Sequence, residues 1–233
     1  AYNEAGKIGA VVRKVRDAAG RIHDARIAMV VVDDASTDAT PREAQDAGAI
    51  VQRHERNRGV GAAIRTGIDW AVANGCVIVA VISGDDQHDP DELPRVLAPV
   101  LSGEREFVQG SRWMAGGRVV NAPSSRQWTT RAYARLMSLA SGRRCTDGTN
   151  GLRAFTTSLL KEKRINLWQD CLDGYELEPY FLYKVLTLGC RYAEVPITIR
   201  YHHEHGGCTK MKPFRDWWRI FRPLLFLRLG IWK

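Results

Sequence analysis

Residues 76–90 read CVIVAVISGDDQHDP, and this stretch decides the expected fold. Its first half, residues 76–82, is a continuous and largely β-branched apolar run, which predicts a parallel strand covered on both faces. Shorter apolar runs alternate with helical periods up to residue 110. Such alternation predicts a doubly wound α/β half with its ligand site at the carboxyl ends of the strands. The expected helices are 7–19, 40–47, 61–73, about 126–139 and 178–188, and the expected strands are 28–32, 49–51, 76–82 and one ending at 108–110.

The second half of the stretch crowds carboxylates at the end of this strand. Asp85, Asp86 and Asp89 follow it closely, and unpaired negative charge beside a buried strand is costly. Mg²⁺ and Mn²⁺ take oxygen ligands and bridge carboxylates to phosphates, so we expect Asp85 and Gln87 to hold one of these ions. The alternative is a capping loop, in which Asp89 and the proline after it open a helix.

Composition limits the function classes. With 233 residues, 45% hydrophobic and 26% charged, the chain is expected to form one α/β domain around one core. The net charge of +8 favours anionic partners, namely phosphorylated substrates, nucleic acid or an acidic bilayer surface. No nucleic-acid-binding motif is recognisable, so nucleic acid is not an expected partner. The five cysteines are scattered without metal-ligand spacing, which predicts free thiols in a reducing compartment.

No signal peptide opens the sequence, and no apolar run reaches the ~20 residues that a bilayer span needs. We therefore expect a soluble or peripheral chain. The sequence starts at Ala1 without a methionine or a preceding apolar strand, which suggests that a few N-terminal residues are missing.

Two further clusters carry polar groups at strand ends. Asp33 and Asp34 follow the strand expected at 28–32 and precede a Ser-Thr-Asp run at 36–38, so several oxygens converge on one loop. Carboxylates there can accept hydrogen bonds from a base or a ribose, although a helix cap plus a turn is the simpler explanation when these residues are taken alone. Arg112 ends a later strand with a guanidinium that can fork onto phosphate oxygens, but a lone arginine is more often a surface charge.

The tail mixes aromatic, aliphatic and arginine residues between positions 217 and 228. This composition is typical of a segment that lies in a membrane interface. The alternative is that these aromatic residues simply pack on the domain.

Several motifs together carry a family resemblance: Ala1-Tyr2-Asn3-Glu4, Val32-Asp33-Asp34-Ala35-Ser36-Thr37-Asp38, Asn57-Arg58-Gly59-Val60-Gly61, Asp85-Asp86-Gln87-His88, Gly110-Ser111-Arg112, Asp147-Gly148-Thr149-Asn150-Gly151-Leu152-Arg153 and Glu194-Val195-Pro196-Ile197. In this order and spacing they resemble family 2 glycosyltransferases of the GT-A fold, particularly polyprenyl-phosphate (dolichyl-phosphate-like) mannose or glucose synthases. The resemblance implies a Rossmann-like, doubly wound mixed sheet with helices on both faces. We expect this GT-A domain at 1–210 and an amphipathic membrane-interface tail at 211–233.

On the donor side, the resemblance implies binding of a UDP- or GDP-linked sugar with Mg²⁺ or Mn²⁺. The family usually has Asp-x-Asp where this chain has Ser83-Gly84-Asp85, so the first carboxylate of that pair is replaced, and Asp86 is a candidate to compensate. A Gly-x-Ser-Lys-like segment ends at Lys210. The implied nucleotide-sugar residues are Tyr2, Glu4, Asp33, Asp34, Gly61, Asp86 and Lys210, and the implied metal ligands are Asp85 and Gln87.

On the acceptor side, Arg112, Arg126 and Thr130 match positions that the similar synthases use. A polyprenyl phosphate is already anionic, so its transfer would need charge neutralisation and positioning more than a base. If the acceptor is instead a glycan or lipid hydroxyl, a carboxylate must take its proton, and Asp147 or Glu176 become candidates.

The resemblance thus implies an inverting hexosyltransferase in the cytoplasm, peripheral at the inner face of the membrane, with Asp85, Arg112, Arg126, Thr130 and Asp147 as its catalytic residues. Ser83 also motivates a different reading, a sugar-nucleotide-binding domain whose catalysis has decayed.

Overall fold

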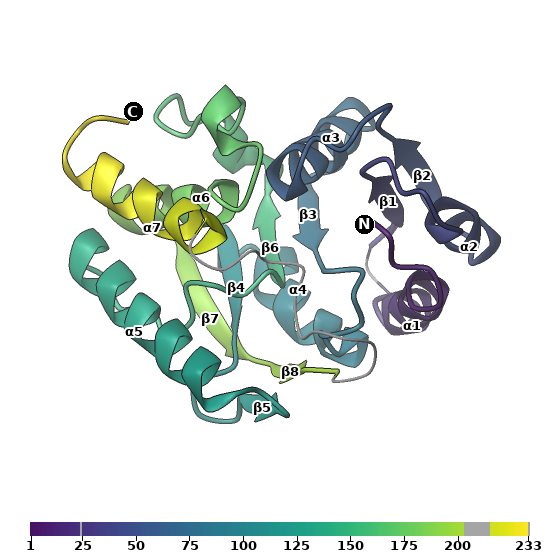
Figure 1. Ribbon diagram of the computed structural model, residues 1–233, viewed down its shortest axis with the longest axis horizontal. Helices are drawn as coiled ribbons and strands as arrows, with labels where there is room; N and C mark the ends of the chain where they lie inside the picture. The colour runs from purple at the N-terminus through teal and green to yellow at the C-terminus, as the bar shows by residue number, and fades with distance from the viewer. Residues whose placement is uncertain (24, 203–214, 233) are drawn as a thin grey trace.

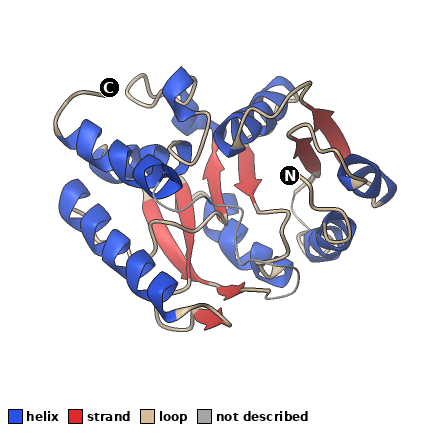
Figure 2. Cartoon of the chain, viewed as in Figure 1, coloured by secondary structure: helices blue, strands red, loops and turns tan. Residues whose placement is uncertain are grey.

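The computed structural model describes residues 1–23, 25–202 and 215–232 (Figure 1). Helices and strands alternate through the first half of the chain, as expected, and Figure 2 shows their distribution. In chain order the elements are α1 (Ile8–Ala19), β1 (Val30–Asp33), α2 (Thr40–Asp46), β2 (Ile50–Arg53), α3 (Val60–Ala73), β3 (Ile78–Val81), η1 (Pro90–Glu92), α4 (Leu93–Leu101), β4 (Phe107–Ser111), β5 (Arg118–Val120), α5 (Ser124–Ser141), β6 (Arg153–Thr156), η2 (Thr157–Lys161), η3 (Asp170–Leu172), α6 (Leu177–Thr187), β7 (Tyr192–Pro196), β8 (Thr198–Arg200) and α7 (Arg215–Arg228).

The strands form a mixed arrangement, which confirms the expected sheet type. β1 and β2 pair in parallel, with Asp33 opposite Arg53 at their carboxyl ends. The central sheet has the order β3-β6-β4-β7, in which β6 runs antiparallel to both neighbours while β4 and β7 are parallel. β5 and β8 make a separate parallel pair, and a bridge from His88 to Ile199 of β8 holds the loop after β3 against it.

The expectation for residues 76–82 was wrong in two respects. β3 pairs antiparallel with β6 rather than in parallel, and none of its residues is fully buried; Val77, just before it, is 73% exposed. The physical reason is that β3 is an edge of the central sheet. Ile78 and Ala80 line a cavity that Val30 and Val32 of β1 line as well, so β3 borders a cavity and is not covered on all sides.

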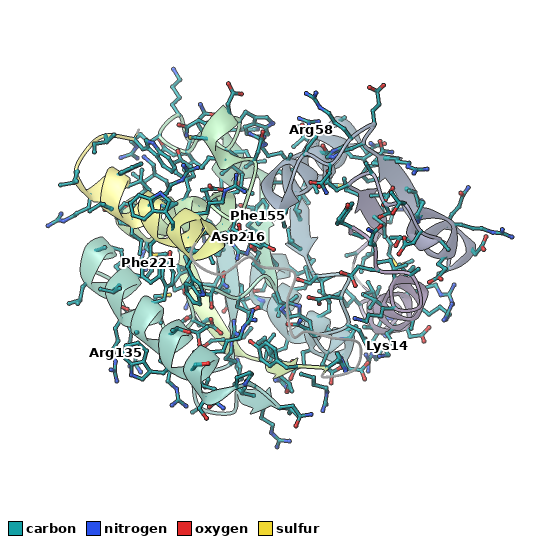
Figure 3. All side chains as sticks on the ribbon, viewed as in Figure 1. Lys14, Arg58, Arg135, Phe155, Asp216 and Phe221 are labelled. Atoms are coloured by element: carbon teal, nitrogen blue, oxygen red, sulfur yellow. The ribbon has the colours of Figure 1, made fainter. Side chains whose placement is uncertain are left out.

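The main core joins the central sheet to the helices of the second half. Phe107 of β4 stacks on Phe155 of β6 at 6.0 Å between ring centroids, and Phe181 of α6 meets Phe107 edge-on at 5.2 Å. Ile220 and Leu224 of α7 are buried in the same cluster. Figures 1 and 3 show α7 lying beside α5 and α6, with Phe221 labelled on the helix. α7 therefore packs on the domain, while the predicted boundary at 210/211 lies outside the described residues.

The described cysteines, Cys76, Cys145, Cys171 and Cys190, are free thiols, as expected. Among the described residues, no helix combines the length and apolarity that a bilayer span requires.

Gly61 and Gly67 of α3 offer a matched test of the packing under the site. A Cβ at Gly61 would overlap the carbonyl oxygen of Leu172, whereas one at Gly67 would lie 3.5 Å from Val32, an ordinary contact. We expect Gly61→Ala to lower the free energy of unfolding by roughly 2–3 kcal/mol through overpacking. Gly67→Ala should leave it unchanged or raise it by up to ~1 kcal/mol, because alanine favours the helix. Urea denaturation measures both, and equal effects would contradict the packing described here.

Candidate active site

A cavity of about 1200 Å³ runs along β1 and β3 and includes the loop at the carboxyl end of β3. Its walls come from the N-terminal segment, the start of α3, the loop after β3, the first turns of α5, residues 174–179 and α7. The structure brings most of the predicted site residues together here: Tyr2, Glu4, Asp34, Asp85, Gln87, Arg112, Arg126 and Thr130. Asp33, Gly61, Asp86, Asp147 and Glu176 do not line it, and Lys210 lies outside the described residues.

Asp34 shapes the loop that leads into α3. Its carboxylate accepts the backbone N–H groups of Arg58 and Gly59, each at 2.8 Å, and its Oδ1 lies 2.7 Å from Nδ1 of His54. Gly59 has a φ of 102°, a conformation that glycine adopts without strain. The carboxylate thus fixes the turn that presents this loop to the cavity.

The neighbouring carboxylate of Asp33 is fully buried and stabilises the loop that follows β1. Its Oδ1 accepts the backbone N–H of Ser36 at 3.2 Å, and Nε of Arg53 lies 3.2 Å from its Oδ2. The turn interpretation of this loop therefore holds for Asp33.

The N-terminal segment is tied to the same loop. The hydroxyl of Ser36 accepts the N–H of Asn3 at 2.9 Å, and that of Thr40 accepts the N–H of Glu4 at 2.7 Å. These two bonds place Tyr2 and Glu4 at the cavity wall.

Asp85 and Asp86 point in different directions. Asp85 lines the cavity, and its Oδ1 accepts the N–H of Gln87 at 3.1 Å. Asp86 adopts a φ of 61° and turns its carboxylate to Nζ of Lys14, at 3.0 Å, on α1. The predicted contact of Asp86 with the nucleotide sugar therefore has no support in its placement. Asp89 caps η1 by accepting the N–H of Asp91 at 3.2 Å, so the capping alternative holds for this carboxylate.

The donor atoms fit a hard divalent cation that is only partly coordinated by protein. Asp85, Gln87 and Ser83 all line the cavity and offer carboxylate, amide and hydroxyl oxygens, which suit Mg²⁺ or Mn²⁺. Within the described ranges, no three His, Cys, Asp or Glu side chains gather into a metal cage. The arrangement matches an ion that takes its remaining ligands from water and substrate phosphates.

His88 anchors the end of this loop. Its Nε2 lies 2.9 Å from Oδ1 of Asn150, and burial lowers the pKa of the imidazole. The same Asn150 oxygen accepts the N–H of Leu152 at 2.8 Å. His88 thus joins the loop after β3 to the loop before β6.

Arg112 and Asp147 form a buried ion pair with each other. Nε of Arg112 lies 2.6 Å from Oδ2 of Asp147, and Nη2 lies 3.2 Å from Oδ1. Nη1 donates to the hydroxyl of Tyr201 at 2.8 Å. The guanidinium that we expected to fork onto a phosphate already forks onto a carboxylate, and Asp147 is not exposed to take a proton from an acceptor.

Glu176, the other candidate base, is 1% exposed and also ion-paired. Its Oε1 lies 2.5 Å from Nη2 of Arg222 and 3.3 Å from Nε of Arg219, both on α7. Both carboxylates considered for proton abstraction therefore serve buried ion pairs.

Arg126 and Thr130 begin α5 at the cavity edge. The guanidinium of Arg126 lies 5.0 Å from the ring centroid of Tyr201, and no salt bridge to Arg126 occurs in the part of the chain that the structure describes. The hydroxyl of Thr130 donates to the carbonyl of Arg126 at 2.8 Å. Arg126 is thus a cation on the wall, whereas Thr130 steadies the helical turn beneath it.

Sequence reasoning missed the residues that the segment just before α6, the first turn of α6 and α7 contribute. Tyr175, Glu178, Asp216 and Arg219 all line the cavity. The tail composition suggested a membrane segment, yet its helical period was informative: Asp216, Ile220 and Leu224 share one face, and that face is the buried one.

Comparisons with known proteins identify the family and the fold. A family model described as Glycosyl transferase family 2 matches residues 1–163. Undecaprenyl-phosphate mannosyltransferase from Micrococcus luteus is 32% identical over 205 residues, covering 84% of this chain and 79% of the relative. Dolichyl-phosphate hexose transferase from Haloferax volcanii is 32% identical over 213 residues, covering 91% and 84%. Polyprenol monophosphomannose synthase from Mycolicibacterium smegmatis is 30% identical over 219 residues, covering 90% and 78%.

Among solved structures, glucosyl-3-phosphoglycerate synthase from Mycobacterium tuberculosis in complex with Mn²⁺ and uridine-diphosphate-glucose matches with a TM-score of 0.69 at 22% identity. The match covers 100% of this chain and 78% of that one, and it confirms the expected GT-A fold. With its first 163 residues matched by the family model and relatives above 30% identity along most of its length, the chain belongs to glycosyl transferase family 2 and is a glycosyltransferase.

Proposed function

We propose that this glycosyltransferase is an inverting enzyme that moves a hexose from a UDP- or GDP-linked donor to a membrane-borne polyprenyl phosphate. The proposal rests on the ion pairing of the two carboxylates that could act as bases. Asp147 and Glu176 are both buried in ion pairs, while Arg126 faces the cavity as a cation. With the two carboxylates considered for proton abstraction held in ion pairs, the site suits an acceptor whose oxygen is already ionised. The names of the relatives at 30–32% identity support the same acceptor class.

The reaction needs few groups from the protein. A phosphate oxygen of the acceptor attacks the anomeric carbon, and the bond from that carbon to the donor's diphosphate breaks, releasing a nucleoside diphosphate. Tyr2, Glu4 and the loop fixed by Asp34 would hold the nucleoside, while Asp85 and Gln87 would hold Mg²⁺ or Mn²⁺. When bound there, the ion supplies charge neutralisation for the leaving diphosphate. Arg126 would align the acceptor phosphate, and the helical turn below it is held by Thr130.

A hydroxyl acceptor is the second candidate, because Asp147 or Glu176 would become available if its ion pair opened. The buried geometry of both pairs disfavours this. A decayed binding domain is the third candidate, motivated by Ser83, although the Ser83 hydroxyl still lines the cavity beside Asp85.

We also propose that α5 and α7 meet the membrane surface from the cytoplasmic side. Trp128 and Leu139 of α5 are 72% and 80% exposed, and Trp218 and Leu225 of α7 are exposed as well. Exposed arginines accompany them on both helices, namely Arg131, Arg135 and Arg228. Exposed apolar side chains among arginines match an interface with anionic lipid.

Asp85→Ala should abolish the metal-dependent part of donor binding and lower transfer to polyprenyl phosphate by about 100-fold, because charge neutralisation is lost. Asp86→Ala is the matched control, since this neighbouring carboxylate contacts Lys14 instead, and it should retain near wild-type behaviour. Thermal shifts with UDP, GDP and their sugars, with and without Mn²⁺ or Mg²⁺, measure binding. Unchanged binding in Asp85→Ala would refute the metal assignment.

Nucleotide binding by the wild type without transfer to any acceptor would favour the decayed domain.

Asp147→Asn separates an ion-pair role from a base. If the pair is structural, the variant should lose ~3 kcal/mol of unfolding free energy, because the charge of Arg112 stays buried without its partner. A double variant, Asp147→Leu with Arg112→Leu, should recover part of that loss. Urea denaturation measures these differences. A variant of wild-type stability that fails to glycosylate a hydroxyl acceptor would instead identify Asp147 as a base.

Leu139→Glu should lower the fraction bound to vesicles containing anionic phosphatidylglycerol by about tenfold, because an apolar contact becomes a repelled charge. Val77→Glu is the matched control: Val77 is 73% exposed but precedes β3, outside α5 and α7. Co-sedimentation with vesicles gives the bound fractions. Equal losses in the two variants would contradict a membrane-facing surface on α5.

A further inference from the structure

The buried carboxylate of Glu176 is shared by two arginines of α7. Arg219 and Arg222 are about one helical turn apart, and both reach Oε1 of Glu176, at 3.3 and 2.5 Å. One negative charge thus faces two positive ones, so the cluster keeps an excess positive charge. The two arginines differ in their surroundings, because Arg222 packs on the protein while Arg219 faces the cavity.

Arg222 belongs to the interior. Its Nη2 also donates to the carbonyl of Cys171 at 3.2 Å, and its guanidinium lies 5.4 Å from the ring centroid of Trp232. Arg222 does not line the cavity. These contacts make it an anchor of α7.

Arg219 lines the cavity and its side chain is 40% exposed. Glu176 lies closest to its Nε, which leaves the outer end of the guanidinium facing Gly174 and the cavity. A Cβ at position 174 would lie 2.9 Å from Nη1 of Arg219, so the glycine makes room for this guanidinium. A half-exposed guanidinium with one edge held by a buried carboxylate is preorganised to receive an anion.

The surroundings place Arg219 near the reacting groups. Tyr175, which follows Gly174, has a raised pKa, first because of burial and then because of the negative charges of Asp216 and Glu178, while Arg126 opposes the rise and Asp85 adds to it. Arg126, Tyr175, Asp216 and Asp85 line the same cavity as Arg219. Figure 3 shows Asp216 at the end of α7 that lies over the middle of the molecule.

We infer that Arg219 is a second acceptor-binding residue, which holds the phosphate of the polyprenyl phosphate together with Arg126. The inference rests on the proposed function. Arg126 and Arg219 stand on α5 and α7, the helices that carry the exposed residues Trp128, Leu139 and Trp218. A phosphate held between these helices leaves its prenyl chain room to run toward that apolar surface.

The matched test compares Arg219→Ala with Arg222→Ala, because each removes one guanidinium from Glu176 and only Arg219 faces the cavity. Steady-state transfer to polyprenyl phosphate in detergent should show the KM for the acceptor raised about tenfold in Arg219→Ala and partly restored in Arg219→Lys. In Arg222→Ala that KM should stay within about twofold of wild type, even if the melting temperature falls. Donor affinity, measured by titration with the nucleotide sugar and metal, should be unchanged in all three.

Three results would overturn the inference. Equal rises of the acceptor KM in both alanine variants would make Arg219 a structural anchor only. A weaker donor affinity with an unchanged acceptor KM would assign Arg219 to the donor's diphosphate, the other source of phosphate in this cavity. If the acceptor KM and the donor affinity are both unchanged in Arg219→Ala, then Arg219 has no role in binding. Absence of transfer to polyprenyl phosphate by the wild type is a different failure: it overturns the proposed function, and this inference with it.

Discussion

The ion pair between Arg112 and Asp147 holds together the strand ends and loops on which the site is built. It joins the end of β4 to the loop before β6, and both members are buried. Glu194 of β7 completes the connection by accepting the backbone N–H groups of Thr146 and Asp147, at 2.8 and 3.0 Å. Neither member can be removed singly without leaving a buried charge unpaired, which costs several kcal/mol. The strand ends that carry the site are therefore held in one arrangement.

This constraint decides which polar groups remain for chemistry. Asp34 and Asp33 are committed to backbone N–H groups and to His54 and Arg53, and Glu176 to two arginines. Asp85 is the carboxylate of the loop after β3 that lines the cavity, and Arg126 and Arg219 are cations on its wall. A cavity with a carboxylate for a metal ion and guanidiniums for anions is suited to handling phosphates rather than to removing protons.

Local patterns in the sequence predicted what depends on local physics. Helical periods and apolar runs located the elements of the first half, and strand ends located Asp34, Asp85 and Gln87 at one cavity. Tyr2 and Glu4, which line the same cavity, were expected there only from the family resemblance. The partner of a strand is a non-local property, so the apolar run at 76–82 revealed neither the antiparallel pairing of β3 nor its edge position. The same limit applies to charges: Arg112 and Asp147 are 35 residues apart, and nothing near either one reveals that they neutralise each other. The sequence did not separate the roles of the adjacent carboxylates Asp85 and Asp86, because Asp86 contacts Lys14 on another element.

α7 shows why composition alone is a weak guide to the role of a helix. Its aromatic and arginine residues suggested a segment apart from the domain, yet Ile220 and Leu224 belong to the main core and Asp216 and Arg219 to the cavity wall. The opposite face keeps Trp218 and Leu225 exposed. A helix with these two faces links any surface that it contacts to the geometry of the site, because a shift of α7 would move Arg219 and strain its ion pair with Glu176. If the outer face rests on a bilayer, the surface that supplies a lipid phosphate also holds the guanidinium that receives it.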